Sequence, residues 1–542
     1  MKKQNFLKGS IILMISAVIT KLLGALFKIP LTNMLGGVGM SYFSCAYSLF
    51  MPIYALTVTG LSAAVARMTA QSAALGMYDN ARRVRRTALM IFSAAGLAGS
   101  LLTALLAKPF CVYAMNCPEA SAAVAMISPA VFFGCITAVE RGYYEGLSNM
   151  YPTAVSQLAE GLVKVFAGLF LCSYVSENAE KVMLLFPGMT DIRAASAAAG
   201  ILGVTLSSAG AALFFAVIRL FNRSDAKRGD KTLVRHREIA RELTATALPI
   251  GVSAVVTNLT ALIDMGTVIG CISYFGSRMA VPEGITADEM PHFIYGSFAG
   301  IALTVFNLVP SVTNMLGKGV LPSITSAWEK RDRQALQRGT MQALLTASII
   351  AVPAAFGMGV LSGEILHFLF PKQHDEVEIC INSLRFLMPG MVCLCLSFPI
   401  FSMLQAIGKA SAPLKIMIVG AAVKLVGNLI TIPFMEAEGA AVSTSICYIL
   451  ILAVSLRLFA SETGIELPVK PFAAVIYAGA MCSASAYLVS DILKMHGSGE
   501  VFRLFAAAAA GGIVYLGVIA AMRDTIESGG GVFRKTAKPK TI

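Results

Sequence analysis

The sequence predicts an all-α integral membrane protein of about fourteen transmembrane helices, arranged as two six-helix lobes followed by two C-terminal helices. Hydrophobic residues make up 56% of the chain and charged residues 13%, whereas soluble domains carry about 25% charged residues. Apolar runs of ~20 residues, long enough to cross ~30 Å of hydrocarbon as helices, recur along the chain. Segments of the first half also reappear in the second half. The composition and the apolar runs indicate that lipid is the solvent, and the repeat indicates two lobes.

The predicted helices follow the apolar runs in order. Helices satisfy their backbone polar groups internally, as hydrocarbon requires, and the strand alternation of a membrane barrel is absent from the sequence. A signal peptide is a poor interpretation of the first run, which contains Lys21 and Lys28 and precedes no small-residue cleavage pattern. The expected ranges are 8–28, 40–66, 87–107, 121–144, 151–173, 194–219, 244–270, 292–327, 340–361, 381–407, 412–433, 439–460, 470–490 and 503–522.

Basic residues lie in connections on one side of the predicted membrane. The net charge of +13 therefore indicates orientation and contact with anionic membrane lipids, and no nucleic acid is expected as a partner. This distribution predicts that both termini are cytoplasmic. The basic segments are Arg82–Arg86, Arg219–Arg241, Lys330–Arg338 and Arg534–Lys540, and acidic segments on the opposite side are Glu283–Glu289 and Asp375–Glu378.

An internal repeat divides the predicted protein into two lobes. Glu145–Asn149 resembles Gln405–Lys409, and an intramembrane lysine recurs as Lys164 and Lys424, at an offset of 260 residues. Two similar bundles facing each other can rock about a central site, so the repeat favours a transporter. The expected domains are an N-terminal lobe at 1–220, a basic cytoplasmic linker at 221–243, a C-terminal lobe at 244–460, and two helices with a basic tail at 461–542.

Ionisable and polar residues inside the apolar runs are the candidates for substrate binding. Each intramembrane charge costs ~2.5–3.5 kcal/mol on insertion scales, so it needs a partner, a wet cavity or an escape to the interface. Cations outnumber acids, which favours an anionic ligand such as a phosphate or diphosphate. The candidates chosen on this basis are Lys21, Lys28, Arg67, Gln157, Glu160, Lys164, Asp264, Lys424 and Asn428.

Structural roles for several of these residues stay open at this point. Lys28 and Arg67 can extend to the membrane interface. Glu160 and Lys164 can form an ion pair within one helix, and a neighbouring helix can hold Asp264.

Motifs for other chemistry are absent from the sequence. It has no phosphate-binding loop, no HExxH and no GxSxG, so we expect neither enzymatic activity nor a cofactor. The eleven cysteines show no metal-ligand spacing, and no metal site is expected. Cys111 and Cys117 share one predicted outer loop, which leaves a disulfide between them open.

Several motifs resemble those of one family. Lys21-Leu22-Leu23-Gly24 with Lys28-Ile29-Pro30, and later Arg141-Gly142-Tyr143 with Gly146, are similar to the stage V sporulation protein B group of polysaccharide and lipid II flippases. That group belongs to the multidrug/oligosaccharidyl-lipid/polysaccharide exporter superfamily, which includes the MATE-like transporters. The similarity extends from about residue 10 to 460. Further matches are Pro152-Thr153-Ala154, Ser156-Gln157, Glu160, Leu259 to Asp264, Tyr295-Gly296, Phe306-Asn307-Leu308, Leu321-Pro322-Ser323-Ile324, Leu404-Gln405 and Gly408-Lys409.

The resemblance implies that the protein flips undecaprenyl-diphosphate-linked cell-wall precursors across the bacterial cytoplasmic membrane by alternating access. It implies a central cationic cavity for the diphosphate, with basic residues at Lys21, Lys28, Arg67 and Lys164, and it adds Arg141 to the substrate-binding candidates. Gly161 departs from the family pattern, which has glutamine there. The implied partners are the lipid-linked oligosaccharide, a coupling ion (H⁺ or Na⁺) and cell-wall synthesis proteins.

Three other functions are compatible with the sequence. A cation-coupled multidrug exporter of the same superfamily would use Asp264 or Glu160 to bind its ion. A membrane glycosyltransferase or polymerase would need larger outer loops and clustered acids. The third is a scaffold for sporulation or septal wall synthesis that transports nothing.

Overall fold

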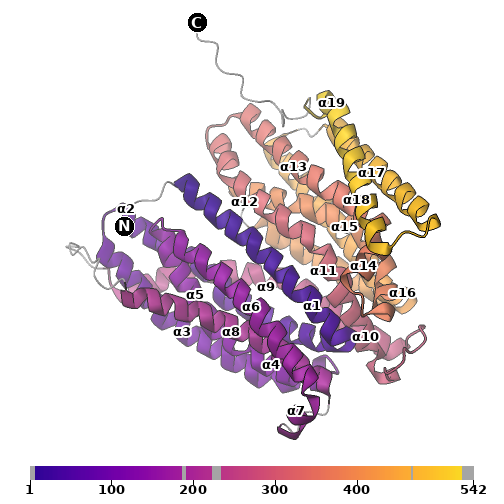
Figure 1. The fold of residues 1–542 in the computed structure, drawn as a ribbon. Helices are drawn as coiled ribbons and strands as arrows, with labels where there is room; N and C mark the ends of the chain where they lie inside the picture. Colours follow the sequence, from indigo (N-terminus) through magenta and orange to yellow (C-terminus); the bar gives the residue numbers. More distant parts are fainter. Residues whose placement is uncertain (1–5, 186–190, 222–233, 410, 466–467, 528–542) are drawn as a thin grey trace. The chain divides into compact units, whose positions relative to one another are not determined.

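A computed structural model describes residues 6–185, 191–221, 234–409, 411–465 and 468–527. Every regular element in this described part is helical (Figure 1), which confirms the predicted all-α membrane fold. The chain forms two compact units, one up to Gly300 and one from Ile301. Residues 222–233 of the predicted linker and the predicted basic tail at 534–540 lie outside the described residues. The repeat-based lobe boundaries stay a prediction.

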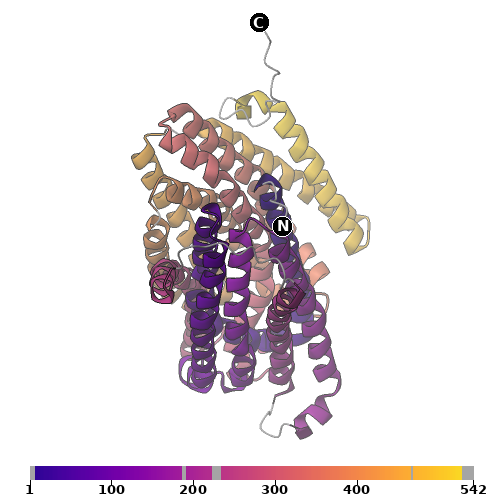
Figure 2. The ribbon, with the colours of Figure 1, turned by 90° about the vertical axis from the view of Figure 1, so that its left-hand side faces the viewer.

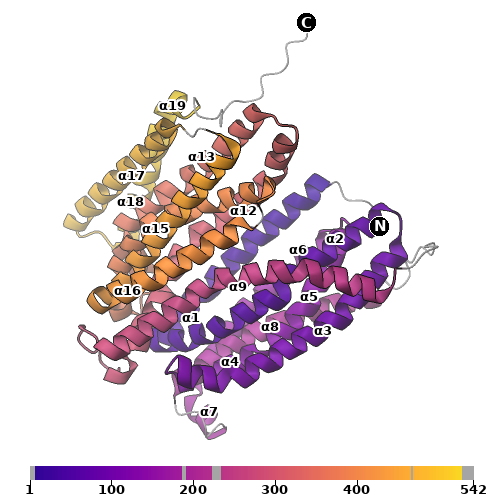
Figure 3. The ribbon, with the colours of Figure 1, turned by 180° about the vertical axis from the view of Figure 1, so that it is seen from behind.

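The first unit is a bundle whose helices run side by side (Figure 2). Helix α6 packs on α1 and α8, and α9 packs on α1, α2 and α3 (Figure 3). Its elements are α1 (Phe6–Tyr54), η1 (Ala55–Thr59), α2 (Gly60–Ala74), α3 (Tyr78–Pro109), η2 (Phe110–Ala114), η3 (Pro118–Ala120), α4 (Ser121–Ile127), α5 (Pro129–Gly146), α6 (Tyr151–Glu177), α7 (Ala179–Leu185), α8 (Ile192–Phe221), α9 (His236–Phe275), η4 (Ala287–Glu289) and α10 (Met290–Ser297).

The second unit pairs α15 with α16 and α17 with α18. The π-helix η5 (Phe298–Ala302) leads into it from α10. Its other elements are α11 (Leu303–Phe306), α12 (Leu308–Glu329), α13 (Arg333–Val360), α14 (Ser362–Leu369), α15 (His374–Ala406), α16 (Ala412–Thr463), α17 (Val469–Met495), α18 (Glu500–Ala521) and α19 (Arg523–Glu527).

Large apolar side chains cover the outside of the helices, as expected for a protein whose solvent is lipid. Leu105 on α3 is 75% exposed and Phe166 on α6 is 70% exposed. Among the described residues, eleven helices are long and apolar enough to cross a membrane, or up to twelve if one bent pair counts as a single span. The chain is therefore a multi-pass membrane protein.

Two of the membrane-spanning segments are far longer than one crossing requires. Ile15–Ala74 has 60 residues and Ala412–Thr463 has 52, whereas a single crossing needs ~20. Each contains one residue with non-helical backbone angles, Gly36 in α1 and Glu436 in α16. The predicted total of fourteen counts each of these segments as two spans, and it stays a prediction.

Several predicted boundaries were wrong in the same direction. The segments predicted as basic loops at Arg82–Arg86 and Lys330–Arg338 are largely helical, because α3 begins at Tyr78 and α13 at Arg333. Hydropathy detects only the part of a helix that lies in hydrocarbon, and a helix can continue into water with charged side chains.

The helix predicted at 292–327 is interrupted, since Ala287–Phe306 and Leu308–Asn314 meet at a 45° bend.

The internal repeat is visible in matching helix ends. In the first unit, Ser148 N–H donates to Glu145 O (2.9 Å) and Asn149 N–H to Tyr144 O (3.0 Å). In the second unit, Gly408 N–H donates to Gln405 O (3.1 Å) and Lys409 N–H to Leu404 O (2.9 Å). Both sets form the Schellman arrangement that ends a helix with one left-handed residue. The sequence match at an offset of 260 residues thus corresponds to the same turn.

The left-handed residues of these two turns, Ser148 and Gly408, predict opposite effects of substitution on stability. Ser148 has φ of 58° and Gly408 has φ of 85°, a conformation that costs little for glycine only. We expect Ser148→Gly to stabilise the protein by about 0.5–1 kcal/mol and Gly408→Ala to destabilise it by a similar amount. Thermal unfolding in detergent measures both. Because a Cβ at Gly408 meets open space, a loss much larger than this would contradict the backbone explanation.

Candidate functional site

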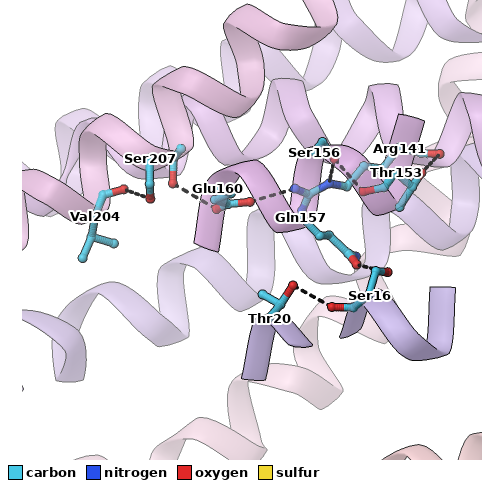
Figure 4. Close-up of polar contacts among 10 residues, drawn as sticks. Ser16, Thr20, Arg141, Thr153, Ser156, Gln157, Glu160, Val204 and Ser207 are labelled. Carbon is cyan, nitrogen blue, oxygen red and sulfur yellow. Dashed lines mark hydrogen bonds and ion pairs between the residues drawn. The ribbon is translucent and has the colours of Figure 1, made fainter. Parts of the chain in front are cut away.

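The predicted polar residues of the first unit lie along the contact between α1 and α6. Ser16 Oγ on α1 donates to Gln157 Oε1 on α6 at 3.3 Å (Figure 4). Farther along both helices, a Cβ at Gly161 would lie 2.9 Å from Leu23, and one at Gly168 would lie 2.6 Å from Phe27. The two helices therefore run in the same direction, and glycines on α6 allow the close approach.

Glu160 forms an ion pair with a residue of the preceding helix. Arg141 Nη2 on α5 lies 2.7 Å from Glu160 Oε2, and Arg141 Nε donates to Ser156 Oγ at 2.9 Å (Figure 4). Ser208 Oγ on α8 donates to Glu160 Oε1 at 3.4 Å. Arg141 thus neutralises Glu160, and the alternative of a pair between Glu160 and Lys164 within α6 was wrong.

The pair of Arg141 and Glu160 makes a stability prediction. Arg141→Ala leaves the Glu160 carboxylate without its counter-charge, and we expect a loss of roughly 1–3 kcal/mol. This is below the 3–5 kcal/mol of a fully buried pair because the side chains are 17% and 27% exposed. Removing both charges in Arg141→Ala/Glu160→Ala should restore part of the loss in thermal unfolding. A double variant as unstable as the sum of the single variants would exclude coupling.

Lys164 and Lys28 lie close to each other with neutral oxygens as partners. Lys164 Nζ on α6 donates to Tyr47 Oη at 3.1 Å and lies 5.0 Å from the centre of the Phe27 ring. Lys28 Nζ on α1 donates to Ala299 O at 2.9 Å. The two ammonium groups repel each other electrostatically. Lys28 thus binds a neighbouring helix instead of extending to the membrane interface.

The partner of Lys28 belongs to an irregular helical turn. Ala299 and Gly300 lie in the π-helix η5, and such turns occur frequently at functional sites. Thr32 Oγ1, one turn after Lys28, lies 3.3 Å from Gly300 O. Two residues of α1 therefore contact two consecutive carbonyl groups of η5.

The remaining predicted residues differ in how far they are buried. Lys21 and Arg67 are exposed on α1 and α2. Asp264 on α9 is only 2% exposed and interacts electrostatically with Tyr295. Lys424 and Asn428, which are 3% and 0% exposed, lie on α16 of the second unit.

Sequence reasoning missed several partners. Tyr47 and the Ala299 carbonyl had no signal in the sequence, because a hydroxyl and a backbone oxygen are present in many helices. Glu140 was detectable as a carboxylate in an apolar run; its Oε2 lies 2.7 Å from Arg85 Nη2, and Arg85 also lies 4.8 Å from the centre of the Tyr143 ring. In the part of the chain that the structure describes, no group of three or more His, Cys, Asp or Glu side chains is arranged to hold a metal ion.

A polar cavity of about 630 Å³ lies elsewhere in the first unit. Tyr42 Oη donates to Asp191 Oδ2 at 3.1 Å, and Arg193 forms ion pairs with Asp191 and with Glu289. Residues of this network, with Asn116 and His292, line the cavity. None of the predicted substrate-binding residues lines it.

Two family models match the chain. The model described as polysaccharide biosynthesis protein matches residues 6–328. The model described as lipid II flippase MurJ matches residues 294–506.

Individual proteins are similar to the chain over nearly its whole length. The lipid II flippase MurJ of Bacillus subtilis (strain 168) is 23% identical over 94% of each chain. Stage V sporulation protein B of the same organism is 22% identical over 95% of each chain. These matches agree with the resemblance identified in the sequence.

Solved structures share the fold. A structure of lipid II flippase MurJ in an inward closed conformation aligns with a TM-score of 0.64 and 16% identity, covering 95% of this chain and 100% of that chain. An inward-facing multidrug resistance MATE family transporter of the MOP superfamily aligns with a TM-score of 0.63 and 14% identity, covering 84% of this chain and 98% of that chain.

Proposed function

Because the chain belongs to the polysaccharide biosynthesis protein family, we propose that it is a flippase for a lipid-linked cell-wall precursor. The substrate is an undecaprenyl-diphosphate-linked unit, lipid II or a related polysaccharide unit. The physical task is to carry a diphosphate and sugars across hydrocarbon while the prenyl tail stays in lipid. The names of the relatives at 23% and 22% identity support this substrate class.

One observation of the site carries the proposal. Lys28 and Lys164 lie close enough to repel each other, and their partners are a carbonyl and a phenol instead of carboxylates. Two like charges in apolar surroundings are unfavourable until an anion joins them. A diphosphate carries that charge and accepts hydrogen bonds from both ammonium groups.

The polar contact between α1 and α6 gives the headgroup a route to these lysines. Ser16 lies twelve residues before Lys28 and Gln157 seven residues before Lys164, or roughly 10–20 Å at 1.5 Å per residue. Lys21 is two turns before Lys28 on the same face of α1. In this proposal Lys21 and Arg67 attract the diphosphate, and Gln157 and Asn428 contact sugars. Arg141 orders Glu160, and Lys424 serves the second lobe.

Alternating access completes the mechanism. Rocking of the N-terminal lobe at 1–220 against the C-terminal lobe at 244–460, joined by the linker at 221–243, exposes the headgroup to each side of the membrane in turn. The protein acts in the bacterial cytoplasmic membrane with both termini in the cytoplasm, and cell-wall synthesis proteins are its functional partners. A transporter of this kind catalyses no covalent step.

Reconstitution tests the proposal. Vesicles containing fluorescent lipid II are treated with a membrane-impermeant reagent that quenches exposed headgroups. We expect the purified protein to make the inner-leaflet headgroups accessible, while vesicles with a denatured sample keep about half of them protected. Protection that persists in the presence of folded protein would reject the proposal for this substrate.

Asp264 supports a second candidate, a cation-coupled exporter. Its carboxyl group is 2% exposed on α9, and a buried acid of this kind can bind H⁺ or Na⁺. The same residue would serve as the coupling site of a flippase. If the protein exports a cationic dye only when Asp264 is present, and does not flip lipid II, the exporter is favoured. If an ion gradient drives lipid II flipping in the wild type but not in a variant without Asp264, then Asp264 is the coupling residue of a flippase.

A further inference from the structure

Three cysteines that are distant in the sequence meet in the first unit. Cys45 lies on α1, Cys111 in η2 and Cys117 between η2 and η3, and all three side chains are 0% exposed. The Sγ atoms of Cys45 and Cys111 are 3.8 Å apart. Cys45 also interacts with the Cys117 thiol. Cys45 is therefore the centre of the cluster and touches both loop cysteines.

We propose that this cluster is an oxidation site at which Cys45 forms a disulfide with a cysteine of the 111–117 segment. The bond would join α1 covalently to the connection between α3 and α4. Cys111 and Cys117 were considered as partners of each other from the sequence, but the geometry places Cys45 beside both. Closing the gap of 3.8 Å between Cys45 Sγ and Cys111 Sγ to the ~2.05 Å of a disulfide needs a side-chain rotation and a small backbone shift.

Cys117 is the thiol that reacts first. Hydrogen bonds from the Cys45 thiol and from His292 lower its pKa to about 6 despite burial, and the thiolate is the nucleophilic form of cysteine. His292 is fixed by Ser41, 3.2 Å from its Nδ1, and by Asn116 O, 3.0 Å from its Nε2. His292 and Asn116 also line the cavity of about 630 Å³, which gives a small oxidant an approach.

A hydroperoxide is the oxidant that suits a buried thiol. The Cys117 thiolate attacks one peroxide oxygen, the O–O bond breaks, and hydroxide leaves to become water, which produces a sulfenic acid. The Cys45 thiol then attacks the Cys117 sulfur, forms the S–S bond and expels a second water. Two thiols lose two electrons in total, and hydrogen peroxide takes them up. Exchange of the new bond with the Cys111 thiol would give the Cys45–Cys111 disulfide.

Disulfide mapping tests the proposal without any transport assay. The folded protein in detergent is treated with hydrogen peroxide, denatured, alkylated and digested without reductant, and linked peptides are identified by mass spectrometry. We expect a peptide pair that joins Cys45 to Cys117 or to Cys111. A Cys111–Cys117 link, a Cys117 sulfonic acid without a link, or three fully alkylated thiols would each overturn the proposal.

Two variants sharpen the result. Cys45→Ser should abolish both links, and its Cys117 should then stop at the sulfenic acid or a higher oxyacid. Cys172→Ser, which changes another fully buried cysteine on α6, should leave the link intact. Peroxide should also raise the thermal unfolding midpoint of the wild type by several degrees, because a cross-link restricts the unfolded chain, and reductant should reverse the shift. If peroxide forms the link but does not raise the unfolding midpoint, the bond lies in a misfolded fraction of the protein. That result would contradict the proposal.

Discussion

Replacing Lys28 and Lys164 together by methionine should reduce lipid II flipping at least about 100-fold. Each ammonium group that binds the diphosphate contributes about 1.5–3 kcal/mol as a charged hydrogen-bond donor, or roughly tenfold or more in rate. Methionine keeps the length of the side chain and removes the charge. Headgroup accessibility in vesicles measures the rate.

The same variant should fold at least as well as the wild type. The two ammonium groups repel each other, and neutral side chains remove both this repulsion and the cost of charge in an apolar environment. We therefore expect an unchanged or higher unfolding midpoint together with lost flipping. Lys494→Met, at an exposed lysine in the last turn of α17, is the matched control. Full flipping in Lys28→Met/Lys164→Met would remove the two lysines from the mechanism.

The location of these lysines was predictable from the sequence, but their environment was not. A lysine inside an apolar run is noticeable because a charge in hydrocarbon has a high free-energy cost. Lys164 has a second signal, since Lys424 occupies the matching position of the internal repeat. The partners were invisible, since Lys28 binds the backbone oxygen of Ala299, which has no signature in the side-chain sequence. Lys28 and Ala299 are 271 positions apart, and a contact over this distance depends on how the helices pack. The periodicity of residues within one helix gives no information about that packing.

The pairing of Glu160 illustrates a second limit. Spacing along α6 placed Lys164 one turn away and left a pair within that helix open. Arg141 reaches Glu160 from α5 instead, at 2.7 Å. The short turn that ends α5 at Gly146 returns the chain as α6, so residues 19 positions apart become neighbours. The resemblance to a family pointed to Arg141, whereas the charge pattern within helices did not.

Among glycine-to-alanine changes in the first unit, Gly296→Ala should produce the largest loss of stability. A Cβ at Gly296 would lie 1.7 Å from Gly37 O and 2.7 Å from Ser41 N, both backbone atoms of α1. Backbone cannot rotate away as a side chain can, so α10 must move away from α1. Overpacking of this kind costs 1–3 kcal/mol or more. The unfolding midpoint in detergent, with protein yield from membranes, measures the effect.

The displacement should also weaken flipping in the protein that still folds. Ala299, which holds Lys28, lies three residues after Gly296, so a shift of α10 carries this carbonyl with it. Gly266→Ala on α9 is the matched control, because a Cβ there meets nothing within 4 Å and alanine favours a helix by ~1 kcal/mol. It should unfold at the same temperature as the wild type or higher. Equal midpoints for Gly296→Ala and Gly266→Ala would show that α1 and α10 are not packed as described.

Binding of undecaprenyl diphosphate, which has the tail and the diphosphate but no sugars, is the most direct measurement of how the substrate is held. Native mass spectrometry of the purified protein should detect this lipid on the wild type in preference to undecaprenyl monophosphate. The preference should vanish in Lys28→Met/Lys164→Met and persist in Lys494→Met. Equal retention of the diphosphate lipid by all three proteins would contradict a site built on the two lysines.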